Sequence, residues 1–337
     1  MLDGMVQRQH HMLRSAATGG SDFGGEREMS RSALIAGGPG LKLCGGAMAT
    51  PHADKVRHGG ERGVNHRDLG HAGDDAYFVG GEKAMGVADG VGQWSEKGID
   101  SGEYSRKLMS TCLQATESSY GERQSASALL VSSASGVAQA DIQGSSTACI
   151  LTLDQATGVA SIANLGDSGV LIGRWNAEKG TPRVVFRSPQ QEHEFGYPFQ
   201  LGHHEHADHP ATAQTFTVVL EAGDIVLLGT DGLFDNLSDA DILDEAFKHA
   251  NESSSGGGVD GGEAGETRAI DACRSLDLRR LAVKMASSLV EMAYFKSVDK
   301  RADTPFSMSA SEAFDIVYRG GKKDDVTVVV GCVAPNS

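Results

Sequence analysis

The stretch GDDAYFVGGEKAMGVADG, residues 73–90, predicts a β-hairpin that carries an acidic residue at the outer end of each strand. Apolar residues follow Asp75 and precede Asp89, and the paired glycines between them mark the turn. If the hairpin is symmetric about Glu82, Asp75 lies opposite Asp89, and opposed residues have Cβ atoms about 5 Å apart. Two carboxylates at that separation repel each other unless one is protonated or a cation lies between them.

Carboxylates also mark the ends of other strand-like segments. Asp231 follows the apolar run 224–230, and Asp167 lies in a tight turn. The acidic pair 324–325 precedes the apolar run 326–333. Ordinary turn chemistry accounts for any one of these residues, since Asp and Gly are common in turns. Taken together, with no Lys or Arg matched to them in the pattern, they predict a site for a hard cation, Mg²⁺ or Mn²⁺, at one end of a sheet.

The remaining patterns predict the class α+β. Further strand-like segments are 147–153, 158–164, 169–174, 184–187 and 215–220. The turns that join the first three are too short for a parallel crossover, which predicts an antiparallel meander. Amphipathic helices are expected at 102–118 and 276–297, with weaker patterns at 125–140 and 238–250. The expected architecture is an antiparallel sheet covered by long helices.

Composition limits the class of protein. The 337 residues carry a net charge of −15, which argues against a nucleic-acid binder, since that class needs clustered Lys and Arg. No apolar run reaches the ~18–20 residues of a membrane span, so no integral membrane segment is expected. The five cysteines are odd in number and widely spaced, which indicates reduced thiols in an intracellular compartment. The sequence shows no oligomerisation signal, so a monomer is the default expectation.

Two segments differ in composition from the rest. Residues 1–40 are rich in Gly, Ser, Arg and His without a sustained period, and we expect a disordered or targeting tail. Acidic residues within them are unusual for a transit peptide, so cytoplasm, mitochondrion and chloroplast stay open. Residues 252–266, ESSSGGGVDGGEAGE, are expected to form a mobile Gly-rich insert in a domain that spans 41–334.

The segments with strand-end carboxylates belong to a longer, ordered set of motifs. The set is GDDAYF (73–78), VADGVGQW (87–94), GSSTA (144–148), NLGDSG (164–169), TDGLFDN (230–236) and KKDDVTVVV (322–330). Together these motifs resemble the metal-dependent protein phosphatases of the 2C type, most closely the DGVGxW branch with mitochondrial and plant members. The resemblance covers about residues 41–333. It implies a four-layer α/β/β/α sandwich, in which helix pairs flank two antiparallel central sheets.

The resemblance also implies a centre of two Mn²⁺ or Mg²⁺ ions at one end of the sandwich. Its implied protein ligands are Asp75, Asp89, the Gly90 carbonyl, Asp231 and Asp324. The implied activity is hydrolysis of phosphoserine and phosphothreonine in protein substrates, by in-line attack of a hydroxide that bridges the two ions. No covalent phosphoenzyme is implied, so the ligand aspartates would act through metal-bound water.

Three more acidic residues have supporting roles by motif position. Asp74, beside Asp75, would help to hold metal-bound waters. Asp167 matches a family aspartate that is linked to a third, weaker ion. Asp235 would support the ligands from outside the ligand set.

The sequence departs from the family pattern at two positions. Val91 stands where many members have a His that is proposed to protonate the leaving group, so the general acid is unassigned and a metal-bound water is the default. Gly70 stands where the family often has an Arg that binds the substrate phosphate, and Arg62 and Arg67 are the nearby candidates for that role. These departures motivate an alternative, a weak or inactive pseudophosphatase that binds phosphoproteins. The retained ligand carboxylates oppose it, because they would destabilise a protein that had no use for metal.

Two other patterns carry competing chemistry. GDSG at 166–169 resembles the nucleophile motif of trypsin-like proteases, but a catalytic His context and the structural disulfides are missing. The segment 203–209 contains His203, His204, His206 and His209, which fits either a Zn²⁺ site or a solvated loop. The lack of a partner Cys and of a fixed helical spacing favours the loop.

Overall fold

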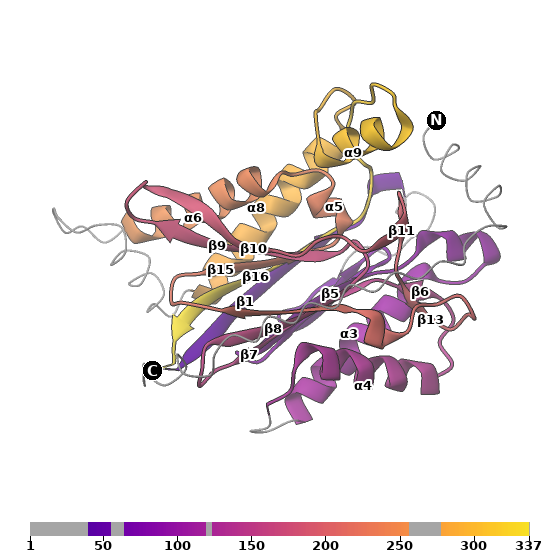
Figure 1. Ribbon diagram of the computed structural model, residues 1–337, viewed down its shortest axis with the longest axis horizontal. Helices are drawn as coiled ribbons and strands as arrows, with labels where there is room; N and C mark the ends of the chain where they lie inside the picture. Colours follow the sequence, from indigo (N-terminus) through magenta and orange to yellow (C-terminus); the bar gives the residue numbers. More distant parts are fainter. Residues whose placement is uncertain (1–39, 55–63, 119–122, 256–277, 337) are drawn as a thin grey trace, which may run out of the picture. The chain divides into compact units, whose positions relative to one another are not determined.

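Two antiparallel sheets face each other and carry helices on their outer sides, so the fold has four layers (Figure 1). This computed structural model describes residues 40–54, 64–118, 123–255 and 278–336. Sheet A has the order β1 (Leu41–Thr50), β16 (Val326–Pro335), β15 (Ile225–Gly229), β9 (Gly169–Asn176) and β10 (Thr181–Arg187). Sheet B has the order β14 (Gln214–Val219), β8 (Val159–Leu165), β7 (Ala148–Asp154), β5 (Ala84–Asp89), β4 (Asp75–Gly80), β3 (Leu69–Ala72) and β2 (Val64–Asn65). The predicted α/β/β/α sandwich is confirmed.

A pair of long helices covers the outer face of each sheet (Figure 1). The helices α3 (Ser101–Ser118) and α4 (Ala126–Gln139) lie on sheet B, and α6 (Asp239–Ser255) and α8 (Leu278–Val298) lie on sheet A. All four confirm the helices predicted from apolar spacing. The stripe of Leu281, Met285 and Leu289, for example, is buried against the side chains of sheet A.

Shorter elements complete the fold. They are η2 (Gly92–Lys97), β6 (Ser145–Ser146) with β13 (Leu201–Gly202), β11 (Glu192–Glu194) with β12 (Tyr197–Pro198), η3 (Pro210–Thr212), α5 (Asp231–Phe234) and α9 (Pro305–Phe314). The helix α9 was not predicted, although Thr304 and Ser307 form a capping box at its start and Pro305 occupies its first turn. The capping box and the proline are the sequence features that could have predicted this helix.

The strand β16 shows why its residues form a central strand. Val328 and Val330 pack toward α6 and α8, whereas Val329 and Val333 pack between the two sheets. Because both faces of the strand are covered, its sequence is apolar throughout and does not alternate with polar residues. The branched valines also suit an extended backbone.

The hairpin β4–β5 has the register that its sequence predicts. Asp75 pairs with Asp89, and Gly80 pairs with Ala84, which is symmetry about Glu82. The two carboxylates therefore lie at the same end of sheet B, as expected.

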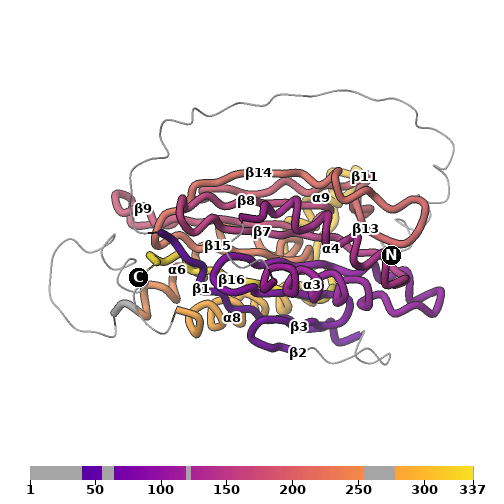
Figure 2. The backbone as a smooth tube through the Cα atoms, turned by 90° about the horizontal axis from the view of Figure 1, so that it is seen from below, coloured from indigo at the N-terminus to yellow at the C-terminus, as the bar shows by residue number. Residues whose placement is uncertain are grey.

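The predicted meander is wrong in its third strand. The strands β7 and β8 pair in sheet B, where β14 takes the other edge of β8, and these three strands run side by side (Figure 2). By contrast, β9 lies in sheet A between β15 and β10. Gly166 has φ +105°, a left-handed conformation that suits glycine and lets the chain cross between the sheets at 166–168. A short turn can join facing sheets as well as neighbouring strands, so turn length did not decide the pairing.

The strand β1 was not predicted either, and it is ordered by its partner. Gly45 and Gly46 weaken the local strand signal. All ten residues of β1 nevertheless pair with β16, from Leu41 opposite Pro335 to Thr50 opposite Val326. Long-range pairing therefore outweighs local propensity here.

Parts of the expected division of the chain fall outside the described residues. Of the predicted tail 1–40, the structure describes Gly40, and of the predicted insert 252–266 it describes 252–255, which end α6. The domain boundaries thus stay predictions. Among the helices that the structure describes, none has both the length and the apolar character needed to cross a membrane.

Arg174 on β9 anchors the turn before β15, and removing it should destabilise the fold. Its guanidinium donates to the two carboxylate oxygens of Asp224 at 2.6 and 2.8 Å, and Asp224 is fully buried. Replacing Arg174 by alanine leaves this carboxylate buried without its cation. We expect a loss of about 3 kcal/mol in the free energy of unfolding, measured by urea denaturation.

The matched control is Arg183→Ala, on the position of β10 that pairs with Arg174. Arg183 is exposed, so its loss should change the free energy of unfolding by less than about 0.5 kcal/mol. Equal effects of the two substitutions would show that the Arg174–Asp224 pair has no special part in stability.

Candidate metal centre

The acidic ends of strands from both sheets meet at one end of the sandwich. Asp75 and Asp89 are opposite residues of β4 and β5 in sheet B. Thr230, which follows β15 of sheet A, donates its hydroxyl to Asp75 Oδ2 at 2.8 Å. Its neighbour Asp231 begins α5. This buried hydrogen bond brings Asp75 and Asp231 together from segments far apart in the sequence.

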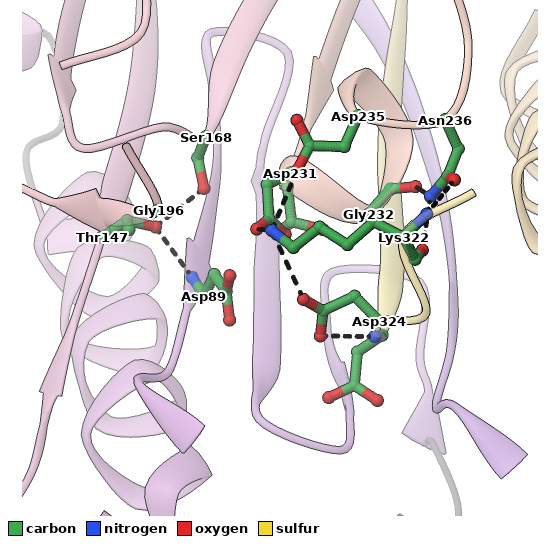
Figure 3. Close-up of polar contacts among 12 residues, drawn as sticks. Asp89, Thr147, Ser168, Gly196, Asp231, Gly232, Asp235, Asn236, Lys322 and Asp324 are labelled. Atoms are coloured by element: carbon green, nitrogen blue, oxygen red, sulfur yellow. Dashed lines mark hydrogen bonds and ion pairs between the residues drawn. The ribbon is translucent and has the colours of Figure 1, made fainter. Parts of the chain in front are cut away.

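Hydroxyl groups from two other motifs hold Asp89 in place (Figure 3). The Asp89 N–H donates to Thr147 Oγ1 at 3.1 Å, and Thr147 Oγ1 lies 2.7 Å from Ser168 Oγ. The Thr147 N–H in turn donates to the Asp89 carbonyl at 2.9 Å. Since Ser168 follows Asp167, these contacts also fix the turn that carries Asp167.

Asp74 and Gly90 are joined through the backbone. The Gly90 N–H donates to the Asp74 carbonyl at 3.0 Å, and the Ser105 hydroxyl of α3 donates to the same carbonyl at 2.5 Å. Two of the implied site positions are thereby held in a fixed relation to each other and to α3.

Asp325 is a positioning residue that the sequence analysis missed. Its carboxylate accepts the N–H groups of Asp74 and His52, each at 2.8 Å, and the residue is 1% exposed. These bonds tie the start of β16 to the hairpin that carries Asp75. The sequence feature that could have revealed Asp325 is its place as the second aspartate of the pair 324–325, to which the motif reading gave no role.

Lys322 lies among three carboxylates of the site (Figure 3). Its ammonium donates to Asp231 Oδ2 and to Asp235 Oδ2, the latter at 2.9 Å, and lies 3.7 Å from Asp324 Oδ2. The expectation that no Lys or Arg is matched to the acidic cluster is therefore wrong. The sequence shows two adjacent lysines before Asp324, and only the fold decides which of them turns inward.

Asn236 fixes the backbone of Lys322. Its Nδ2 donates to the carbonyls of Lys322 and Gly232, each at 2.9 Å, and its Oδ1 accepts the Lys322 N–H at 3.0 Å. Asn236 is fully buried and was also missed, although it is the last residue of the motif TDGLFDN. It fastens the segment before β16 to α5.

Burial sets the protonation equilibria of this cluster. Burial raises the pKa of Asp231 to about 6; Lys322 opposes that rise, and Asp324 and Asp235 add to it. Burial, followed by the charge of Asp231, raises the pKa of Asp167 well above its usual value. Burial by itself would lower the pKa of Lys322, but the surrounding carboxylates outweigh it and hold that pKa well above its usual value. The carboxylates therefore crowd one another and favour a nearby cation.

The donor groups fit a hard divalent cation. Asp231 Oδ1 and Asp167 Oδ1 are buried and accept no hydrogen bond from the described residues, which is costly without a cation. All the implied ligands are oxygens, which Mg²⁺ and Mn²⁺ prefer. Within the described ranges, however, no three His, Cys, Asp or Glu side chains are already grouped to hold an ion. Lys322 and Thr230 direct the carboxylates of Asp231 and Asp75 toward themselves instead.

The structure does not bring Arg67 to this end of the sheets. Arg67 precedes β3, at the opposite end of β4 from Asp75, where the Val79 N–H donates to the Asp68 carbonyl. Its exposed side chain lies 3.9 Å from the Asp68 carboxylate. The other candidate for phosphate binding, Arg62, lies outside the described residues.

The histidines of 203–209 have separate local contacts. His203 and His204 pack against Trp94, with ring centroids 4.9 and 5.5 Å from the indole. His209 caps η3, and His206 is exposed. The four rings are thus divided among an aromatic contact, a helix cap and solvent.

Comparison with known sequences finds relatives among phosphatases. Residues 80–262 match the family model described as Stage II sporulation protein E (SpoIIE). The chain is 38% identical over 236 residues to "Probable protein phosphatase 2C 55" of Arabidopsis thaliana, with 70% of this chain and 42% of that protein covered. It is 34% identical over 246 residues to "Protein phosphatase PTC7 homolog fig" of Drosophila willistoni, with 70% and 68% covered. The chain spans 42% and 48% of the length of the two Arabidopsis relatives that it matches.

Solved structures share the fold. The X-ray structure of the photosystem II phosphatase PBCP has a TM-score of 0.64 and 29% identity, with 87% of this chain and 98% of that chain covered. The catalytic domain of the serine threonine protein phosphatase PstP, solved in complex with 2 manganese ions, has a TM-score of 0.51 and 17% identity, with 87% and 99% covered. The second similarity supports the architecture of the two facing sheets and nothing finer.

Proposed function

Because the chain belongs to the metal-dependent protein phosphatase 2C family, we propose that it hydrolyses phosphoserine and phosphothreonine in proteins with bound Mn²⁺ or Mg²⁺. The observation that carries the proposal is the arrangement of acidic residues from β4, β5, α5 and the start of β16 at one end of the sandwich. The buried, unpaired oxygen of Asp231 supports a cation at this place. Since the chain spans less than half of its first plant relatives, the activity of the whole protein is part of the proposal.

We assign the protein ligands by motif position and proximity. They are Asp75, Asp89, the Gly90 carbonyl, Asp231 and Asp324 for two ions. Asp74 would hold metal-bound waters, and Asp167 would serve a third, weaker ion. When bound, the ions supply an acidified water for in-line attack and neutralise charge on the phosphoryl oxygens.

The other polar residues of the centre position these ligands. Thr230 sets the direction of the Asp75 carboxylate, and Thr147 sets the backbone of Asp89. Val91, directly after the Asp89–Gly90 pair, has no proton to give, so the leaving alkoxide takes its proton from water. The chain's own contribution is thus orientation and charge, not a covalent nucleophile.

A groove beside Asp235 offers room for the polypeptide that carries the phosphate. Its volume is about 230 Å³, and its lining includes Arg187, Gln190, Ser238, Pro305 and Ser309. The Arg187 guanidinium lies 3.7 Å from the centroid of the Phe234 ring and 3.2 Å from Asp239. A fixed cation among hydroxyl and amide groups suits the polar backbone of an extended peptide.

We expect the substrates to be intracellular phosphoproteins, and organellar ones are the first to test. One similar solved protein is a photosystem II phosphatase, and the DGVGxW branch includes mitochondrial and plant members. The expected oligomeric state is a monomer.

A pseudophosphatase is the second candidate function. The observation in its favour is the position of Lys322, whose ammonium contacts carboxylates that an active enzyme would offer to metal. Val91 and Gly70 add to it, because they replace residues with chemical roles in other members. Such a protein would bind phosphoproteins without turnover.

Removing the metal should abolish activity, and this experiment separates the two candidates. We expect hydrolysis of p-nitrophenyl phosphate and of a phosphothreonine peptide with Mn²⁺ or Mg²⁺, and a loss of at least ~100-fold with EDTA. The readout is phosphate release, with circular dichroism as a control that the chelated protein stays folded. No turnover from folded protein in either metal would contradict the phosphatase and favour the pseudophosphatase.

A further inference from the structure

Lys322 places a positive charge on the carboxylates assigned to metal. Its ammonium donates to Asp231 Oδ2, an assigned ligand, and lies 3.7 Å from Asp324 Oδ2, another assigned ligand. It also donates to Asp235 Oδ2 at 2.9 Å, and Asp235 stands outside the assigned ligand set. An ammonium and a divalent ion therefore have partners in common at this end of the centre.

We propose that Lys322 is an internal cation that stabilises the metal-free centre and competes with divalent ions for Asp231 and Asp324. This inference rests on the proposed metal-dependent function.

The backbone of Lys322 is fixed, so the competition involves its side chain. Asn236 binds the N–H and the carbonyl of Lys322, and Asn236 itself is buried. The Lys322 side chain is 26% exposed, which leaves it a route toward solvent. The ammonium also lies 5.8 Å from the centroid of the Phe306 ring, a weak additional attraction.

Asp235 is a hydrogen-bond partner that the ammonium can keep when metal binds. When Asp231 and Asp324 are given over to a divalent ion, the bond to Asp235 can hold the ammonium inside the site. The lysine then gives up Asp231 and Asp324, keeps its bond to Asp235 and does not need to leave the protein. Asp235 would then serve to keep the ammonium beside the ligand set.

The proposal predicts effects of opposite sign on two measurements. Without the ammonium, the crowded carboxylates of the metal-free protein repel one another, so the metal-free fold becomes less stable. Divalent ions then meet no competing charge, so they bind more tightly. If Lys322 were only structural, its removal would lower both the stability of the metal-free fold and the affinity for metal.

The experiment compares Lys322→Met with Lys323→Met. Lys323 is the neighbouring lysine, exposed and 3.3 Å from Asp54, so its loss removes the same formal charge from the surface. We expect Lys322→Met to lower the thermal midpoint in EDTA by roughly 5 °C and to tighten Mn²⁺ binding, measured by calorimetry, about tenfold or more. Lys323→Met should leave both values near those of the unmodified protein. If Lys322→Met does not fold, Lys322→Gln replaces it, because the amide still donates hydrogen bonds but carries no charge.

The outcomes separate this inference from the proposed function. Equal Mn²⁺ affinity in the unmodified protein and in the Lys322 variant would overturn the inference and leave the phosphatase intact. Weaker Mn²⁺ binding in the variant would overturn it as well. No Mn²⁺ binding by either protein would overturn the metal centre itself, and the inference with it.

Discussion

Asp231→Asn is expected to lower the metal-dependent kcat about a thousandfold, a loss of roughly 4 kcal/mol of transition-state stabilisation. Asp231 is the assigned ligand whose second oxygen is buried and unpaired among the described residues. Asparagine has nearly the same shape but no charge, so the change removes the ligand and keeps the packing. The measurement is steady-state hydrolysis of a phosphothreonine peptide across a range of Mn²⁺ concentrations.

The same variant should not be less stable in EDTA. A measurement of stability in EDTA therefore distinguishes a loss of metal-dependent activity from a loss of folding. The folded state raises the pKa of Asp231 to about 6, whereas an unfolded Asp has a pKa of about 4. The fold therefore favours the protonated form, and the contribution of this group to stability falls as the pH rises through that interval. Above that pH interval the buried, ionised carboxylate of Asp231 destabilises the metal-free fold, and the substitution by asparagine removes this destabilisation. A clear fall in the thermal midpoint at pH 8 in EDTA would contradict this account.

The matched control for this substitution is Asp244→Asn. Asp244 lies exposed on α6, outside the acidic cluster, so kcat and the Mn²⁺ dependence should be unchanged. A comparable loss of activity in the control would show that net charge, and not the ligand, governs the reaction.

Gly232→Ala is expected to cost about 3 kcal/mol of folding stability and to weaken Mn²⁺ binding at least ~10-fold. A Cβ at this position would lie 1.9 Å from the Asp325 carbonyl oxygen and 3.0 Å from the Asp325 carbonyl carbon. Both atoms belong to the backbone, so α5 must move away from the start of β16. That movement separates Asp231 from Asp324. Urea denaturation and Mn²⁺ calorimetry measure the two effects.

Gly136→Ala is the control for the glycine substitution. Gly136 lies in α4, where the nearest atom to a new Cβ is the Thr111 side-chain methyl at 3.2 Å. A small adjustment of that side chain accommodates the change, and alanine favours a helix, so stability should stay the same or rise by up to ~1 kcal/mol. If Gly232→Ala were equally harmless, the close approach of α5 to β16 would not position the centre.

The hairpin shows what the sequence could predict about the site. The symmetric spacing of Asp75 and Asp89 about a Gly-rich turn is a local property, and the structure has that register. The long helices were equally local, because each has its own apolar period. For both, the deciding information lies within about 20 neighbouring residues.

The errors concern choices that are made between distant segments. Whether β9 joins sheet B or sheet A depends on which strand edges are already paired. In a meander β9 would pair with the free edge of β8, but β14 occupies that edge, and β9 pairs with β15 in sheet A. The inward turn of Lys322 depends on Asn236 of another element. Asp325 reads as one more strand-end carboxylate until its bonds to Asp74 and His52 are seen. None of these choices has a period or a spacing that a single sequence reveals.

The pairing of β1 with β16 sets the order in which a newly made molecule matures. During synthesis β1 emerges early, yet the neighbour that β1 needs in sheet A is β16, which emerges last among the described strands. Closing so long a loop is entropically unfavourable and slow. Asp324 and Asp325 directly precede β16, so a nascent chain that ends before them contains Asp75, Asp89 and Asp231 but not Asp324, the last of the proposed ligands. A product of translation that ends before β16 would therefore lack one proposed ligand and leave β1 without the strand that it pairs with, and an unpaired strand is prone to aggregation.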